Sequence, residues 1–249
     1  MRSFANYVLA VFSILFSFAI ELELAETNPI AKVKKVRRAT DARKVNRPWT
    51  LAEREAVFAA APPHLLLPIA IGRWVGMREG DVLRMPKASF DGKTIRVVTG
   101  KRGVPIAVPA AAPLQAIIGQ ALQRASAPGK DGQARPQTIT LCANSRSKPW
   151  TGSGFRSSFF KLIRDLEDRG EIGTGLTFHG LRHTVATELR QLGYDSRAIA
   201  DMPGQKTQAQ ADHYSAEADL EMKMRGVVQK MERANTRGTK LSRKRDKSV

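Results

Sequence analysis

Apolar residues recur along most of this chain at the three- and four-residue spacing of helices, and this spacing limits the available folds most. The clearest stripe runs over residues 155–166, and others predict helices at about 64–74, 114–122 and 178–192. Strand-like sequence is confined to 94–98 and 104–108, and the turn Gly100-Lys-Arg-Gly103 between them predicts a hairpin. The pattern therefore predicts a mainly α fold with a small antiparallel β-sheet (α+β).

Local signals set the expected ends of these helices. Thr50 and Glu53 form a capping box that begins a helix, and Pro62-Pro63 ends it. The next helix is predicted to end at Gly76. The apolar spacing predicts that its inward face consists of Leu66, Ile69, Ala70 and Trp74. Gly193 is a stop signal, and Ser196 is expected to cap a helix that ends at Pro203-Gly204.

The N-terminal segment Phe4–Ile20 is apolar on nearly every side and has two interpretations. Arg2 before it imitates a signal peptide, and its length is marginal for a membrane span, which needs roughly 20 apolar residues. The segment also runs on through an acidic stretch to the helix stop Asn28-Pro29, as a buried helix would. Periodicity alone favours neither interpretation.

The chain is strongly basic, with a formal net charge of +18 and a pI near 10.6. Such an excess favours an anionic polymer, most often nucleic acid, although ribosomal and membrane-surface proteins share it. Residues 30–48 are a basic linker without apolar period, which can lie along DNA phosphates or remain a solvated connector. The basic residues of this linker are Lys32, Lys34, Lys35, Arg37, Arg38, Arg43, Lys44 and Arg47.

Cysteine usage excludes an internal disulfide, because Cys142 is the one cysteine of the chain. The sequence has no CxxC motif and no Cys/His cluster, so no zinc site is predicted. A reducing cytoplasm fits this composition.

Four basic side chains suggest a phosphodiester site. His179 and Arg182 share a helix face, Arg78 follows the break at Gly76, and Lys101 lies at the hairpin tip. Taken singly, each has an ordinary alternative. His179 and Arg182 can be a surface-exposed pair, Arg78 can form an ion pair with Glu79 or Asp81, and Lys101 can be a solvated turn lysine. Together, two arginines can hold phosphate oxygens bidentately, and a lysine can protonate a leaving sugar oxygen.

A tyrosine would complete this chemistry by attacking phosphorus and holding the DNA end covalently. The chain has three tyrosines. Tyr7 lies in the apolar N-terminal segment, and Tyr194 follows a helix end, where packing or capping is expected. Tyr214 lies in a polar stretch and is the candidate nucleophile.

In order and spacing these segments resemble the catalytic domain of tyrosine recombinases, the phage-type integrases. The resemblance covers about Trp49 to Ala218, and its strongest match is His179-Gly-Leu-Arg-His-Thr-Val-Ala-Thr187. It implies that Arg78 and Arg182 clamp the phosphate, that Lys101 is the general acid and that His179 assists proton transfer at the tyrosine. It also implies that Asp81 supports the site and that Gln205 is one of the catalytic-site residues. Tyr214, nine residues after Gln205, would be the nucleophile.

The resemblance further implies a domain plan. Residues 1–29 would be the last helix of a truncated core-binding domain, 49–218 the catalytic domain, 219–232 a C-terminal helix and 233–249 a basic disordered tail. The C-terminal helix would dock on a neighbouring protomer of a tetramer or pack on its own domain. The expected partner is double-stranded DNA, with no cofactor, metal or membrane, in the cytoplasm. The expected DNA contacts are Lys34, Lys35, Arg37, Arg38 and Arg102.

Two departures from the family pattern affect these expectations. Most of the N-terminal clamp is missing, so the chain would be a remnant or its start misplaced, and its helix would expose a large apolar face. Gln205 stands where the family has His or Trp, and Pro203 replaces a leucine. Glutamine donates a hydrogen bond but carries no proton for acid–base work, so a reduced rate is expected. The alternatives are a non-enzymatic DNA-binding remnant, a membrane-anchored protein and a type IB topoisomerase.

Overall fold

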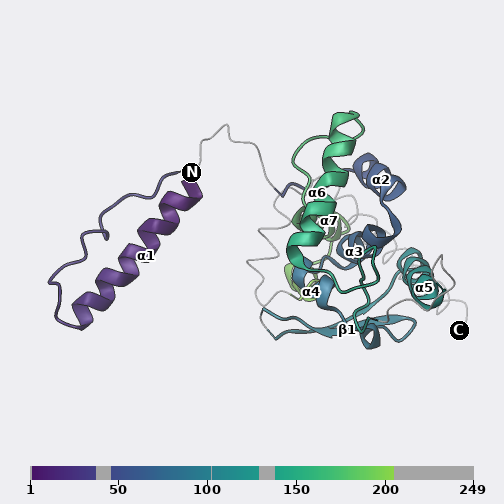
Figure 1. The fold of residues 1–249 in the computed structure, drawn as a ribbon, viewed down its shortest axis with the longest axis horizontal. Helices are drawn as coiled ribbons and strands as arrows, with labels where there is room; N and C mark the ends of the chain where they lie inside the picture. The colour runs from purple at the N-terminus through teal and green to yellow at the C-terminus, as the bar shows by residue number, and fades with distance from the viewer. Residues whose placement is uncertain (1, 38–45, 102, 129–137, 205–249) are drawn as a thin grey trace, which may run out of the picture. The chain divides into compact units, whose positions relative to one another are not determined.

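The structure, a computed structural model, describes residues 2–37, 46–101, 103–128 and 138–204 (Figure 1). The chain divides into two compact units, residues 1–44 and residues 45–249. The boundary falls inside the segment that the sequence indicates as a linker.

The first unit holds one long helix, α1 (Arg2–Glu21). It ends earlier than the predicted stop at Asn28-Pro29, because Glu23 adopts the left-handed conformation with φ 58°. The amide of Leu24 then bonds back to the carbonyl of Ala19 at 2.8 Å, which closes the helix end.

Residues 28–36 return along the polar side of α1. The Asn28 side chain donates to the Ser13 carbonyl at 3.0 Å, and Asn6 exchanges two hydrogen bonds with the backbone of Val36. Helix α1 also exposes large apolar side chains, among them Phe4, Ile14 and Phe18. In the part of the chain that the structure describes, Phe4–Glu21 is the one helix long and apolar enough to cross a membrane, and none of it is buried.

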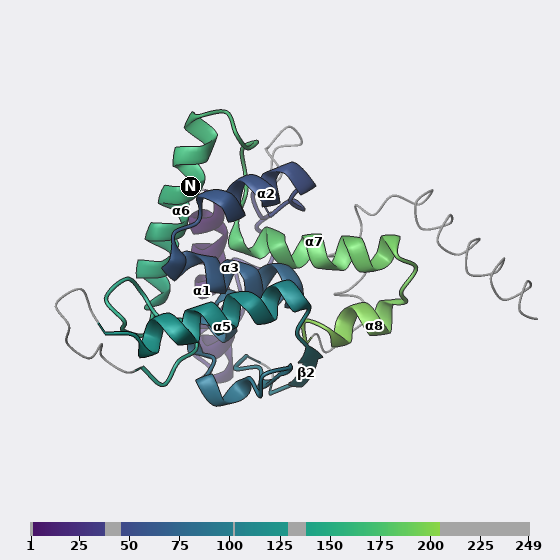
Figure 2. The ribbon, with the colours of Figure 1, turned by 90° about the vertical axis from the view of Figure 1, so that its right-hand side faces the viewer.

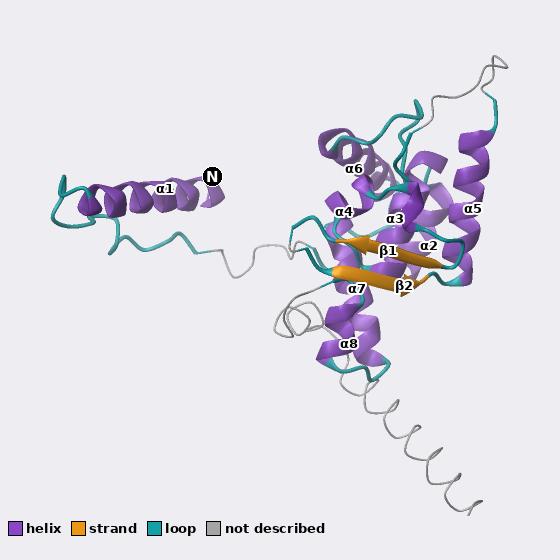
Figure 3. Ribbon diagram, turned by 90° about the horizontal axis from the view of Figure 1, so that it is seen from below, coloured by secondary structure: helices purple, strands orange, loops and turns teal. Residues whose placement is uncertain are grey.

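The second unit confirms the predicted fold class, a mainly helical domain with one two-stranded antiparallel sheet. Its helices are α2 (Leu51–Ala60), α3 (Pro63–Val75), α4 (Glu79–Arg84), the 3-10 helix η1 (Lys87–Ser89), α5 (Ala112–Ser126), α6 (Gly152–Asp168), α7 (Phe178–Gln191) and α8 (Ser196–Asp201). Strands β1 (Thr94–Val98) and β2 (Pro105–Pro109) form the predicted hairpin, with Thr94 opposite Pro109 and Val98 opposite Pro105 (Figure 3).

Helix α3 forms the centre of the core, between α5 and α7 (Figure 2). Ile69 and Ala70 of the predicted inward face are fully buried, but α3 is buried on nearly all sides, including Leu65 and Leu67. Leu66 and Trp74, two residues of the predicted face, are only partly buried. Gly72 allows the close approach of α7, since a Cβ there would lie 2.8 Å from the Phe178 ring.

The local end signals act mostly as predicted. Thr50 and Glu53 form both bonds of the capping box, and Gly76 ends α3 in the left-handed conformation with φ 70°. One cap is corrected: Asp195, and not Ser196, caps α8 by accepting from the amide of Ala198 at 2.7 Å. The predicted C-terminal helix at 219–232 lies outside the described residues.

Candidate active site

Helix α7 carries His179 and Arg182 one turn apart at its N-terminal end. The side chain of Thr177 caps the helix by accepting from the amide of Gly180 at 3.0 Å. Arg182 is only 1% exposed, and its Nη1 donates to the carbonyls of Gly76 at 2.9 Å and Pro203 at 3.0 Å. The alternative of a surface-exposed pair is therefore wrong.

Arg78 lies two residues after the Gly76 carbonyl that Arg182 holds, and it occupies the N-cap position of α4. The alternative ion pairs are not formed, because Glu79 pairs with Arg156 at 2.8 Å and Asp81 with Arg84 at 3.5 Å. Nη1 of Arg78 is buried and has no hydrogen-bond partner among the described residues. A buried guanidinium nitrogen without an acceptor is a candidate donor for an anionic ligand.

Asp81 connects α4 to the hairpin tip. This carboxylate is 6% exposed, and its Oδ1 accepts from the amide of Gly100 at 2.9 Å. Gly103 closes the turn with φ 61°, and its amide donates to the Thr99 carbonyl at 2.9 Å. Lys101 thus lies exposed on a turn whose base is fixed to α4.

A cavity of about 670 Å³ brings three of the predicted residues together: Arg78, Lys101 and His179. Its other lining residues are Glu79, Gly80, Leu83, Arg84, Trp150, Gly152, Arg156 and Phe178. Cationic side chains outnumber the single carboxylate, so the cavity suits a polyanion. Arg182 is not among the described residues that line the cavity, but it holds the Gly76 carbonyl in the loop before Arg78 and the Pro203 carbonyl in the loop after α8.

Comparison with known proteins agrees with this arrangement. The phage integrase family matches residues 54–221 of the sequence. The chain belongs to this family. The resemblance read from the sequence is thereby confirmed, and the domain is a tyrosine recombinase catalytic domain in family and fold. No curated protein sequence matches the chain.

Solved structures of integrases share the fold at low sequence identity. A lambda integrase dimer bound to a COC′ core site is 20% identical with a TM-score of 0.69, over 86% of this chain and 59% of that one. The Tn1549 transposon integrase in complex with circular intermediate DNA is 17% identical with a TM-score of 0.66, over 92% and 78%. XerA recombinase is 19% identical with a TM-score of 0.58, over 90% and 75%. This integrase-family chain thus spans about three fifths of that lambda integrase chain.

Several predicted site residues lie outside the described residues of this family member, namely Gln205, Tyr214, Arg38 and Arg102. Lys34, Lys35 and Arg37 are exposed in the first unit. The DNA-binding roles of these residues stay predictions.

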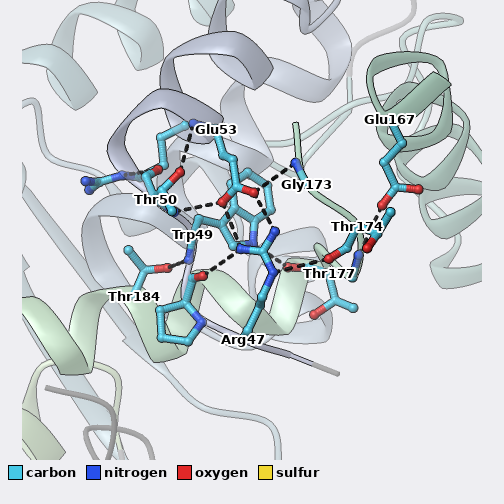
Figure 4. A network of polar contacts seen from close by, with 12 residues as sticks. Arg47, Trp49, Thr50, Glu53, Glu167, Gly173, Thr174, Thr177 and Thr184 are labelled. Carbon is cyan, nitrogen blue, oxygen red and sulfur yellow. Dashed lines mark hydrogen bonds and ion pairs between the residues drawn. The ribbon is translucent and has the colours of Figure 1, made fainter. Parts of the chain in front are cut away.

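Arg47 belongs to the basic linker in the sequence, but its side chain forms bonds within the folded second unit (Figure 4). Its guanidinium forms an ion pair with Glu53, which also accepts from the amides of Thr50 at 2.9 Å and Gly173 at 3.1 Å. Burial raises the pKa of Glu53, but the bonds from Arg47 and Thr50 outweigh it and lower the pKa to about 2. The adjoining Trp49 amide donates to the Thr184 hydroxyl of α7 at 2.8 Å.

Sequence reasoning missed the second set of cations in the cavity, Arg84 and Arg156. Arg156 lies 77 residues from its partner Glu79, and no periodicity or spacing relates the two. The one available signal was the position of Arg156 in the first turns of an amphipathic helix, which does not indicate a site.

Proposed function

We propose that this chain is a site-specific DNA recombinase or integrase that cuts and rejoins double-stranded DNA through a 3′-phosphotyrosyl bond at Tyr214. The supporting observation is the shared cavity. Arg78, Lys101 and His179 come from three distant segments and line it together, and Arg182 holds the loop that carries Arg78.

The proposed reaction is a transfer at phosphorus. The Tyr214 oxygen attacks, the Tyr214 O–P bond forms, and the bond from phosphorus to the 5′ oxygen breaks. Arg78 and Arg182 stabilise the charge that develops on the non-bridging oxygens. His179 assists removal of the phenolic proton, and the Lys101 ammonium gives a proton to the departing 5′ oxygen. Gln205 donates a hydrogen bond to the phosphate.

DNA binding and assembly belong to the same proposal. A net charge of +18 favours a polyanion, and the linker residues Lys34, Lys35, Arg37 and Arg38, together with Arg102, supply cations for it. Among the similar structures, a lambda integrase tetramer is bound to a Holliday junction. We therefore infer a homo-oligomer, a tetramer, on double-stranded DNA in the cytoplasm, with Asp81 supporting the site.

The test is covalent trapping on nicked duplex DNA with randomised sequence around the nick. The wild-type chain should give a denaturation-resistant protein–DNA adduct, and Tyr214→Phe should give none, because it lacks the attacking oxygen. Tyr194→Phe is the matched control and should keep the adduct, since Tyr194 lies at the end of α7. DNA binding without any adduct would favour the non-enzymatic remnant, and an adduct in Tyr214→Phe would refute the assignment of the nucleophile.

A further inference from the structure

The cavity has a further cationic side chain besides the predicted catalytic residues. Arg156 lies in the first turns of α6 and lines the same cavity as Arg78 and Lys101. Its side chain is 56% exposed, and Nη1 donates to Oε1 of Glu79 at 2.8 Å. The Glu79 side chain is 22% exposed and follows Arg78 directly in the chain. The predicted catalytic roles leave this guanidinium unused.

Glu79 is the one carboxylate among the described residues that line the cavity. It lies beside Arg78, where an uncompensated negative charge would repel a phosphate. Burial raises the pKa of Glu79, and the Arg156 guanidinium acts against this and favours the carboxylate. The pair therefore keeps this part of the cavity lining free of net negative charge before DNA is bound.

The pair is also easily exchanged. Since half of the Arg156 side chain is exposed, solvent screens its attraction to Glu79, and such pairs contribute little to stability. A phosphodiester offers the same guanidinium two oxygens in bidentate geometry. The cavity of about 670 Å³ is also much larger than one phosphate group and has room for a neighbouring nucleotide.

We propose that Arg156 binds a second phosphate of the DNA backbone, next to the one that Arg78 holds, and leaves Glu79 when DNA enters the cavity. This proposal rests on the proposed function. It assigns Arg156 as a DNA-binding residue and Glu79 as the group that occupies it in the free protein.

The test measures the affinity for a labelled mixed-sequence DNA duplex as a function of salt concentration. All proteins carry Tyr214→Phe, so that no covalent product disturbs the equilibrium. Arg156→Ala should weaken binding roughly tenfold, as expected for a charge-assisted hydrogen bond. It should also reduce the slope of log affinity against log salt by about 0.9, the value for one lost phosphate contact.

Matched controls lie at the far end of the same helix. Arg169 follows the last turn of α6 and pairs with Glu171 in a similar exposed pair, so Arg169→Ala removes the same charge away from the cavity. Thermal unfolding of each variant checks that the fold is retained. If Arg156→Ala and Arg169→Ala change affinity and slope equally, the proposal is overturned.

Glu79→Gln distinguishes phosphate binding by Arg156 from simple neutralisation of Glu79 by Arg156. It frees Arg156 and should strengthen binding by more than Glu171→Gln, which makes the same charge change elsewhere. In the double variant Glu79→Gln with Arg156→Ala, affinity should fall roughly tenfold below Glu79→Gln alone. If the double variant binds like Glu79→Gln, Arg156 only neutralises Glu79 and the proposal fails. These readouts need no cleavage, so failure of adduct formation in the wild-type chain is a separate result.

Discussion

Asp81 and Arg182 show how single buried charges join distant segments. A buried charge is costly unless it is hydrogen-bonded, so each of these residues fixes the backbone that supplies its partner. Asp81 holds the amide of Gly100 and thereby the turn that bears Lys101. Arg182 holds the carbonyls of Gly76, in the loop before Arg78, and of Pro203, in the loop after α8.

Asp81→Ala should lower the free energy of unfolding by about 1–3 kcal/mol, because it leaves the Gly100 amide without its acceptor. Adduct formation should slow as well, since the turn with Lys101 loses its support. Urea unfolding and the rate of trapping on nicked DNA measure the two effects. Asp81→Asn retains an acceptor oxygen and should lose less of both; equal losses would show that the carboxylate charge, and not the hydrogen bond, holds the turn.

Glu53 gives the domain a pH dependence of known sign. Its pKa is about 2 in the fold and near the ordinary value of 4.5 when unfolded, so its contribution is present above pH 4.5 and is lost as the pH falls towards 2. Glu53→Gln should cost roughly 3 kcal/mol at pH 7. The difference in unfolding free energy between wild type and variant should shrink between pH 4.5 and 2. A difference that stays constant over this range would exclude the lowered pKa.

At the scale of elements, α7 is held in position by the residues just before α2. The indole of Trp49 donates to the Thr177 carbonyl at 3.0 Å, and the Trp49 amide donates to Thr184. Gly180, between His179 and Leu181, allows this contact, since a Cβ there would lie 2.6 Å from the Arg47 carbonyl. The glycine in the strongest family motif thus has a packing reason.

Gly180→Ala should destabilise the protein by about 1–3 kcal/mol, because the new methyl group meets backbone that cannot move aside. Gly119→Ala is the matched control within α5, where a Cβ meets no atom within 4 Å. It should stabilise by about 0.5–1 kcal/mol through helix propensity. Thermal and urea unfolding measure both variants; equal effects of the two alanines would contradict this account of α7.

At the scale of the whole molecule, the two units differ in what they bury. The second unit has a continuous core around α3, whereas α1 exposes apolar side chains along one side. The most exposed include Phe4, Tyr7, Ile14 and Phe18. A contiguous apolar face of this kind favours association.

Ile14→Gln combined with Phe18→Gln should therefore reduce self-association of the full chain, measured by sedimentation velocity over a range of concentrations. Leu51→Gln is the control, because Leu51 is a single exposed apolar residue on α2 and its loss should leave association unchanged. A monomeric wild-type chain, or association that persists in the double variant, would contradict this role of α1. Recovery of the wild-type chain with membranes would identify a lipid partner instead.

Local chemistry in the sequence predicted the helices, the hairpin and the order of the family motifs, because caps, turns and apolar spacing act over a few residues. The end of α1 was mispredicted because Glu23 adopts the left-handed conformation, and the cap of α8 because the neighbours Asp195 and Ser196 compete for that role. Only tertiary structure decided which charges are buried and which partners they meet: Arg182 with the carbonyls of residues 76 and 203, Arg47 with Glu53, and Arg156 with Glu79. The reason is that a guanidinium selects its acceptor by proximity and burial, and the packing of distant segments creates both.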